Sequence, residues 1–522
     1  MADTKREIER KYESYGGGLP DLTAVPGVGA VLDKGVAHLD ATYYDTRDQR
    51  LAAASLTLRR RTGGSDAGWH LKFPVAPGVR DEIHAPLSDT LPDRLAALVR
   101  SRVRDRELLP VVRLRSERDV RHLVDADGRL LAEVSVDTVD AERLIGDGGT
   151  ARWTEIEVEL ADDGDPAFLD KVDKRLRKAG VRPSTSASKL ARALAETAPD
   201  PACTVRAADS VPAATAPAAA PGKKRKTRAA GEPVTAGDHV LAYVRAQRDA
   251  LVELDPAVRQ DVPDAVHRMR VATRRLRSTF RSFRNVLDRE VTDPVGTDLK
   301  WLAGELGLDR DQEVLAARLK SALEDLPGPL VAGPVGDRLA AWSEARHSGA
   351  HGRLTGILDS RRYLSLLDTL DAVLAHPPLR AKAAARPDKP LAEAVRKDAA
   401  KLSALVARAL DLPPGDDRDV ALHEVRKKSK RTRYAAEAAT PALGRPADGL
   451  VRSMKSLQGL LGDHQDSVMA RRTLRELSAV AHAAGENTFT YGVLYAREER
   501  RAELAEAALP EAWSSIRKDV AL

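Results

Sequence analysis

Residues 7–12 read EIERKY, and this stretch decides the fold of the first part of the chain. In a β-strand, residues two apart share a face, so Glu7, Glu9 and Lys11 lie on one face while Ile8 and Tyr12 lie on the other. The same alternation recurs in six further segments: ATYYDT (41–46), LTLRRR (56–61), WHLKFP (69–74), VVRLRSER (111–118), LAEVSVD (131–137) and WTEIEVEL (153–160). Together these segments predict a closed antiparallel β-barrel.

Most of these strands carry charged residues at successive positions of one face and apolar residues on the other. A charged face can simply meet water while the apolar face packs on a core. If the charges face inward instead, they are costly to bury without a ligand. We expect the inward set to be the bases Lys11, Arg59, Arg61, Lys72, Arg113 and Arg115 and the acids Glu7, Glu9, Glu133, Asp137, Glu155, Glu157 and Glu159.

The mixture of charge signs predicts the kind of ligand. Arginine binds phosphate oxygens through two parallel hydrogen bonds, and lysine binds them as a point charge. Clustered carboxylates suit a hard divalent cation, Mg²⁺ or Mn²⁺. A polyphosphate with a bound metal ion would satisfy both signs inside one barrel.

A change of periodicity divides the chain. Residues 198–234 are rich in Ala and Pro and have no apolar periodicity, which predicts a disordered linker. Residues 235–522 change to the 3.6-residue period of helices and are expected to form an all-α domain. Residues 1–197 are expected to form the barrel domain, so the fold class is α+β. Its predicted flanking helices lie at 91–102, 165–179 and 186–197.

Composition indicates the cellular setting. Neither a signal peptide near the start nor a run of about 18 apolar residues that could span a bilayer is visible. The formal net charge of +6 is small, and the single cysteine, Cys203, allows no internal disulfide. We expect a soluble cytoplasmic protein without a membrane partner.

A second decisive stretch is VHRMRVATRRLRSTFRSFRNVL at 266–287, which is rich in arginine and has no acidic residue. As a helix it has an apolar face and an opposite cationic arc of about 80°. Like charges at i,i+4 spacing destabilise a helix, so an unrelieved basic stripe predicts a polyanion site. The stripe consists of His267, Arg270, Arg274, Arg277 and Arg281.

The basic pattern returns in ALHEVRKKSKRTRYAAE at 421–437, with His423, Arg426, Lys427, Lys430, Arg431 and Arg433. Each basic helix is followed by a matching segment, LAGELGLDRDQEV from Leu302 and LQGLLGDHQDSV from Leu457. We interpret this as an internal duplication that brings the two basic helices together.

Charge alone does not separate polyphosphate from nucleic acid, because any polyanion releases counterions on binding. Proteins that bind single-stranded nucleic acid usually add exposed aromatic residues for base stacking. Phe280 and Phe283 lie on the apolar face of the first basic helix, and only Tyr434 flanks the second stripe. Polyphosphate is therefore the expected partner, and nucleic acid is not.

Residues 1–197 resemble the CYTH family of triphosphate tunnel metalloenzymes. The resemblance rests on E-x-E-x-K at 7–11, Y-Y-D-T at 43–46, paired arginines, an isolated strand lysine and a late E-x-E. The family includes class IV adenylate cyclases, thiamine triphosphatases and inorganic triphosphatases, so the resemblance implies a barrel that binds triphosphate in its bore.

The resemblance and the charge pattern together suggest roles for the barrel residues. Glu9, Lys11 and Glu157 would act in catalysis. Triphosphate would bind Arg59, Arg61, Lys72, Arg113, Arg115 and Lys189, and the metal would bind Glu7, Glu9, Asp137, Glu155, Glu157 and Glu159. In this scheme the cationic cage stabilises the transferring phosphoryl group while a carboxylate orients or deprotonates water.

Residues 235–518 resemble the CHAD domain, an α-helical domain named for its histidines. H-x-x-R openings and L-G-x-x-x-D segments in both repeats carry this resemblance. CHAD domains bind polyphosphate through a basic channel and often accompany CYTH domains. The resemblance implies a polymer-binding half and a cytoplasmic location that includes polyphosphate granules.

The expected function is polyphosphate binding with metal-dependent hydrolysis of tripolyphosphate. The alternatives are a non-catalytic polyphosphate-binding protein, a thiamine triphosphatase and a class IV-type adenylate cyclase. A cyclase needs a pocket for adenine, which the sequence does not identify.

Overall fold

The structure is a computed structural model that describes residues 4–14, 18–146, 148–198, 233–347 and 349–520. The chain divides into two compact units, residues 1–224 and 225–522. The linker predicted at 198–234 falls almost wholly on residues 199–232, which lie outside the described residues, as does Cys203.

The first unit is built on one antiparallel sheet with a few helices. Its strands are β1 (Thr4–Glu13), β2 (Ala30–Asp45), β3 (Thr57–Thr62), β4 (Gly68–Ala76), β5 (Val79–Pro86), β6 (Leu109–Val124), β7 (Leu130–Arg143), β8 (Thr150–Leu160) and the short β9 (Arg182–Pro183). Its helices are α1 (Arg50–Ala53), α2 (Asp93–Val103), α3 (Ala167–Lys178) and α4 (Lys189–Glu196). The predicted helices therefore correspond to α2, α3 and α4.

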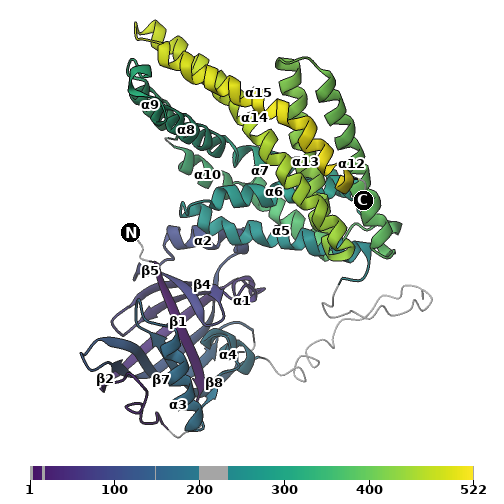
Figure 1. Cartoon of the computed structure of the whole chain (residues 1–522). Coiled ribbons are helices and arrows are strands. Elements are labelled where there is room, and N and C mark those ends of the chain that lie inside the picture. The colour runs from purple at the N-terminus through teal and green to yellow at the C-terminus, as the bar shows by residue number, and fades with distance from the viewer. Residues whose placement is uncertain (1–3, 15–17, 147, 199–232, 348, 521–522) are drawn as a thin grey trace, which may run out of the picture. The chain divides into compact units, whose positions relative to one another are not determined.

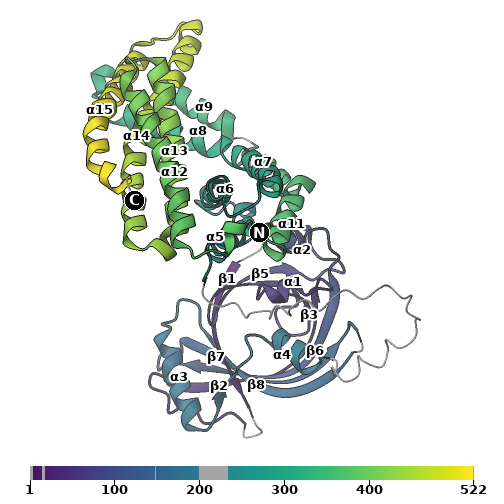
Figure 2. The same ribbon diagram turned by 90° about the vertical axis from the view of Figure 1, so that its right-hand side faces the viewer.

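Eight of these strands close into a ring in the order β5-β4-β3-β2-β6-β7-β8-β1, with β1 pairing back to β5. The first half of β1 pairs with β5, from Thr4 opposite Ile83, and its second half pairs with β8, from Glu9 opposite Glu159. Figure 2 shows the ring nearly end-on. The predicted closed barrel is confirmed.

The apolar outer face of the ring is covered by helices, as amphipathic strands require. On β3, β4 and β5, residues such as Leu58 and Trp69 pack with Leu98 of α2 in one core. On β7 and β8, Ile156 and its neighbours pack with Val172 of α3 in another. The outer face therefore supplies two of the hydrophobic cores of the unit.

A third core lies inside the ring. Leu190 and Ala193 of α4 pack against inward-facing residues that include Leu114 of β6 and Trp153 of β8. Figure 2 shows α4 within the ring of strands. Apolar side chains therefore fill one end of the bore, and charged side chains are confined to the remainder.

The second unit is helical throughout its described residues. Its helices are α5 (Ala236–Arg259), α6 (Ala265–Ser282), α7 (Arg289–Glu305), α8 (Leu308–Glu324), η2 (Gly328–Leu330), α9 (Val335–His347), α10 (Ala350–Asp359), α11 (Arg361–Ala375), η3 (Ala381–Ala384), α12 (Asp388–Asp411), α13 (Asp416–Leu443), α14 (Arg445–Ala483) and α15 (Phe489–Val520). One large core contains Phe280 and Phe283 beside Val425 of α13, which confirms the all-α prediction (Figure 1). Across the described residues, helices long enough to cross a bilayer are all too polar to do so.

The Y-Y-D-T stretch at the end of β2 has a structural role that its sequence did not reveal. Asp45 is buried, and its carboxylate accepts hydrogen bonds from the backbone N–H groups of Thr46, Leu51 and Ala52 at 2.7–2.9 Å. It therefore satisfies the otherwise unpaired N–H groups at the start of α1.

Substitution of Asp45 should destabilise the first unit. In Asp45→Ala the three backbone donors lose a buried charged acceptor, so we expect a loss of about 2–3 kcal/mol in the free energy of unfolding. Asp48→Ala, in the same turn but half-exposed, should cost less than about 1 kcal/mol. Guanidinium unfolding followed by circular dichroism measures both, and equal effects would contradict the capping role.

Candidate functional site

A charged cavity of about 880 Å³ occupies the bore of the first unit. Predicted residues that line it are Glu7, Glu9, Lys11, Arg59, Arg61, Lys72, Glu133, Glu157, Glu159 and Lys189. Lys5, Lys34 and Asp162 also line it and are exposed, so they mark its open mouth. The structure therefore brings most of the predicted barrel residues together in one cavity.

Strand β1 places its acids and its lysine against partners on neighbouring strands. Lys11 Nζ lies 2.9 Å from Glu9 Oε2 and also donates to Glu157 on β8. Lys72 Nζ lies 2.5 Å from Glu7 Oε2. Burial favours the neutral carboxyl of Glu9, but Lys11 and Lys72 together outweigh it and lower the pKa of Glu9.

The paired arginines of β3 both face the bore, while Arg60 between them points outward and donates to the backbone oxygen of Ser88. Burial and the neighbouring Arg59 and Arg118 lower the pKa of Arg61 to about 9. The Nε atoms of Arg59 and Arg61 are buried and have no hydrogen-bond partner among the described residues. These guanidinium groups are crowded and incompletely satisfied, as expected of an anion site.

The prediction that Arg113 and Arg115 face the bore is wrong. Arg113 pairs with Asp40 on the outer face of β2, and the side chain of Arg115 is 56% exposed. Their neighbour Leu114 points inward instead and packs on α4. The apolar core that fills this end of the ring requires Leu114, and strand alternation then turns the two arginines outward.

The bore also contains residues that the sequence reading missed. Arg118 of β6 takes the inward position and forms two hydrogen bonds of 2.7 Å with Asp137 and one of 2.8 Å with Glu157. Further residues of this kind are Tyr43, His70, Arg80, Glu82 and His84. The alternation Arg80-x-Glu82-x-His84 on β5 was a visible signal, because it follows the same period as the segments that were recognised.

Lys189, at the first turn of α4, forms the floor of the charged cavity. Its Nζ lies 2.9 Å from Asp137, 2.7 Å from Glu155 and 2.6 Å from Glu157. Oxygens of these three acids lie close enough to share one cation. The ammonium group already supplies that charge, and Glu155 also accepts from the indole N–H of Trp153.

In the second unit, the two predicted basic helices α6 and α13 pack against each other. Burial and the nearby Arg274 and Arg426 lower the pKa of Lys430 to about 6. Burial and like charges also lower the pKa of Arg277. Among the described residues, Arg274, Arg277 and Lys430 form no ion pair, although the carboxylates of Asp311 and Asp466 lie within electrostatic reach of Lys430.

Other predicted members of the basic stripes are placed differently. His267 and Arg281 are exposed, and Lys427 pairs with Glu424 of its own helix. Arg433 pairs with Glu437, and His423 Nδ1 lies 2.6 Å from Gln465 Oε1.

Two acids that the sequence reading missed neutralise part of the cationic charge. Asp398 is buried and accepts from Ser282 and Lys428, and Arg431 pairs with it at 3.2 Å. Glu437 accepts from Arg275. Asp398 and Glu437 therefore compensate the charges of Lys428, Arg431 and Arg275 on the two basic helices.

The two repeats make matching contacts. Arg270 of α6 forms a bidentate pair with Asp311 at 2.7 and 2.8 Å, and a Cβ at Gly307 would approach its guanidinium to 2.8 Å. In the second repeat a Cβ at Gly462 would meet the guanidinium of Arg426 at 3.5 Å. The glycines of both L-G-x-x-x-D segments therefore lie against the equivalent arginine, which supports the predicted duplication, but only at Gly307 would a Cβ crowd it.

Comparison with known proteins agrees with this division. The CYTH domain family matches residues 5–194, and the CHAD domain family matches residues 242–475. Uncharacterized protein Rv2226 of Mycobacterium tuberculosis (strain ATCC 25618 / H37Rv) is 37% identical over 534 residues, which cover 98% of this chain and 97% of that protein. The chain belongs to the CYTH–CHAD family.

Two solved structures are similar to parts of this CYTH–CHAD protein. PptA from Streptomyces chartreusis is 25% identical, covers 54% of this chain and 99% of its own, and has a TM-score of 0.46. The CHAD domain from the plant Ricinus communis is 24% identical, covers 56% of this chain and 95% of its own, and has a TM-score of 0.44.

A second set of carboxylates lines the CYTH tunnel beside Lys72. Burial and a hydrogen bond with Glu82 raise the pKa of Glu7 to about 8. Burial opposes ionisation of Glu82 as well, but His70 and Lys72 lower the pKa of Glu82. The proton of Glu7 thus compensates negative charge that a metal ion could also compensate. Glu9 of β1 and Glu159 of β8 lie opposite each other in the strand register, next to Glu7 along β1.

Glu7→Gln should change how stability of the CYTH–CHAD protein depends on pH. Because the pKa of Glu7 in the folded state lies above its ordinary 4.5, the folded state retains a proton that the unfolded chain releases. Wild type should therefore lose stability as pH rises from about 4.5 to about 8. Glutamine cannot ionise, so the variant should gain at least about 1 kcal/mol relative to wild type between about pH 5 and pH 9 in metal-free buffer.

Guanidinium unfolding at the two pH values measures this gain. Glu142→Gln removes a half-exposed carboxylate outside the tunnel and should show no comparable change. A difference between Glu7→Gln and wild type that is the same at both pH values would contradict the raised pKa of Glu7.

Proposed function

We propose that the CYTH tunnel hydrolyses tripolyphosphate and the ends of inorganic polyphosphate with a divalent metal, and that the CHAD helices bind the longer polymer. The observation that carries this proposal is the bore itself. The buried Nε–H groups of Arg59 and Arg61 on β3 lack partners there, and Glu7 of β1 keeps a proton in a hydrogen bond with Glu82 of β5. A phosphate chain and a metal would relieve both conditions.

In this proposal the cationic side chains of the bore bind phosphate. Arg59, Arg61 and Arg118 can each present two N–H groups to phosphate oxygens, while Lys72 supplies a point charge. Because all four are shielded from bulk water, their attraction for an anion is stronger than at an exposed surface.

In this proposal the catalytic residues are Glu9, Lys11 and Glu157. A metal held by Glu7, Glu9 and Glu159 would withdraw charge from the phosphate oxygens and lower the pKa of bound water. Lys11 lies between Glu9 and Glu157, so its ammonium can stabilise the negative charge of the transferring group. Glu157 can orient the attacking water as a hydrogen-bond acceptor, with Arg118 and Lys189 fixing its position. Burial opposes its ionisation, but Lys11, Lys189 and Arg118 lower its pKa well below the ordinary value and keep it ionised.

The CHAD half supports polymer binding because its cations exceed the acids around them. Arg274 of α6 lies near Arg426 and Lys430 of α13. A bound polyanion would attract these groups and favour the charged form of Lys430. Such a surface would hold the protein on long polyphosphate, including that of cytoplasmic granules.

A substrate assay separates the candidate activities. Purified protein is incubated with tripolyphosphate, thiamine triphosphate or ATP, with Mg²⁺ or Mn²⁺ and then with EDTA. Phosphate release from tripolyphosphate that EDTA abolishes supports the proposal. No turnover of any substrate would leave only binding, and cyclic AMP from ATP would indicate a cyclase.

Glu9→Gln should abolish turnover while phosphate binding is largely retained, because the cationic cage remains intact. Arg59→Ala should lower kcat/KM by about 10²-fold, the usual cost of removing one preorganised donor to a developing charge. Arg115→Ala is the matched control, since Arg115 lies outside the bore, and it should change kcat/KM by less than about 2-fold. A large effect of Arg115→Ala, or full activity of Glu9→Gln, would contradict the assignment.

Binding of long-chain polyphosphate should take up protons at pH 7. The pKa of Lys430 is about 6 in the free protein, so this amine is mostly neutral at pH 7, and a bound polyanion raises its pKa. Isothermal titration calorimetry in buffers of different ionisation enthalpy measures the protons bound. Lys430→Met should reduce the uptake while Lys427→Met, which alters an exposed lysine, should not. Equal uptake in both variants would rule out Lys430 as the source.

A further inference from the structure

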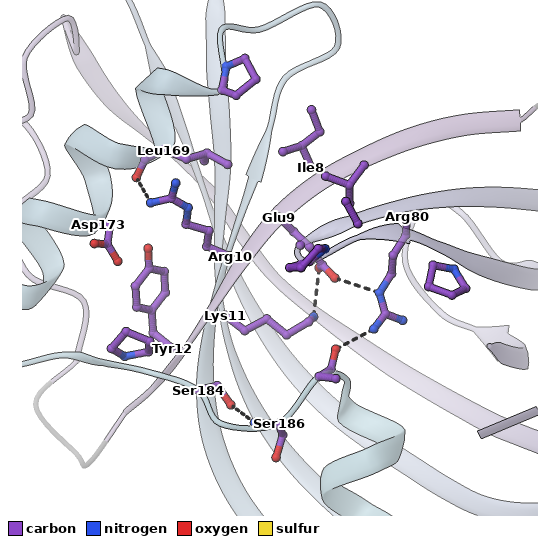
Figure 3. Close-up of a pocket in the computed structure, with 18 of the residues that line it drawn as sticks. Ile8, Glu9, Arg10, Lys11, Tyr12, Arg80, Leu169, Asp173, Ser184 and Ser186 are labelled. Carbon is purple, nitrogen blue, oxygen red and sulfur yellow. Dashed lines mark hydrogen bonds and ion pairs between the residues drawn. The ribbon is translucent and has the colours of Figure 1, made fainter. Parts of the chain in front are cut away.

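A second cavity, of about 780 Å³, opens on the outside of the CYTH barrel beside strand β1. Figure 3 shows that residues of both faces of β1 reach it, with Ile8 and Tyr12 from the outer face and Glu9 and Lys11 from the bore. Glu9, Lys11 and Arg80 line this cavity and the charged tunnel alike. The two cavities therefore meet at these three side chains.

The opening follows from how β1 is paired. Its residues 4–8 pair with β5, and only Tyr12 and Glu13 pair with the short β9 on that same edge. Between these two neighbours the edge is bordered by turns, where Glu9 N–H donates to Gly78 O and Ser184 N–H donates to Lys11 O. The wall of the barrel is therefore interrupted beside residues 9–11.

Side-chain contacts close this interruption. Lys11 Nζ lies 2.9 Å from Glu9 Oε2, and Arg80 Nε lies 3.8 Å from Glu9 Oε1. Arg80 Nη2 also donates to the backbone oxygen of Ala187 at 2.6 Å, across the gap (Figure 3). A phosphate and a metal bound in the tunnel would attract these charged groups. The side-chain contacts that separate the two cavities would then weaken.

We propose that this cavity is a side port through which released orthophosphate leaves. The inference rests on the proposed hydrolysis. Leu190, Ala193 and the inward apolar residues fill one end of the bore, and the remaining polymer would occupy the mouth near Lys5 and Asp162. A phosphate released at Lys11 would be trapped between them unless it left through the wall.

The side chains that line the port are suited to the passage of phosphate. Each turnover consumes one water, breaks the bond between the terminal phosphorus and the bridging oxygen, and yields one orthophosphate and a chain shorter by one unit. Two cations and one carboxylate stand at the inner end of the port, which favours an anion there. The wall beyond includes the apolar residues Val75, Ala76 and Leu169. It also includes Arg10 and Arg177, but these are already paired with Asp170 and Asp173, so the wall binds phosphate weakly and lets it pass.

Substitutions that narrow the port provide the test. Ser186→Trp and Ala76→Trp each place a large side chain in the port from opposite walls. Thr185→Trp is the matched control, because Thr185 is exposed beside Ser186 and does not line the cavity. Phosphate release from long-chain polyphosphate with Mg²⁺ is followed by rapid quench, first with enzyme in excess and then with substrate in excess.

We expect the first turnover in both port variants to match Thr185→Trp, and their steady-state rate to fall by roughly tenfold, so that a burst of one phosphate per enzyme appears. Steady-state rates equal to the control would overturn the port, as would a first turnover slowed as much as the steady state, because the cavity would then position substrate. Absence of phosphate from the wild type in the first turnover would overturn the proposed hydrolysis itself, and the port with it.

Discussion

Strand β1 hydrogen-bonds to β5 through its first half and to β8 through its second, and this double pairing closes the sheet on itself. Closure turns one face of every strand away from bulk water. Charges on that face can no longer be solvated freely, so they must find one another or a ligand. The ion pairs of Lys11, Lys72 and Arg118, and the proton held by Glu7, all follow from this enclosure.

The helical unit reaches a similar condition by packing instead of closure. Each basic helix alone could expose its cations to water, but α6 and α13 bury their apolar faces in one core and so set their cationic faces together. Burial and the resulting repulsion together lower the pKa values of Arg274 and Lys430. Asp398 and Glu437 neutralise part of this cationic surface.

Much of the candidate site was accessible from sequence because a period-two pattern assigns side chains to faces without knowledge of the fold. It succeeded for β1, β3 and β8, where apolar residues such as Ile8, Leu58 and Ile156 mark the outer face. It failed on β6, where both faces carry charges. On β6, the apolar residues of α4 enter the ring and pack against Leu114, which places Leu114 on the inner face. Arg118 shares that face because it lies four residues further along the strand, and Arg115 therefore lies on the outer face.

The sequence by itself determined the two-part organisation, the closed barrel, the helical unit and most of the charged residues of both sites, because local periodicity and charge are properties of neighbouring residues. Only the tertiary structure decided that Lys189 compensates Asp137 and Glu155, that Asp45 caps a helix, and that the barrel wall is interrupted beside Glu9. These features depend on contacts between segments distant in sequence, which no local pattern encodes.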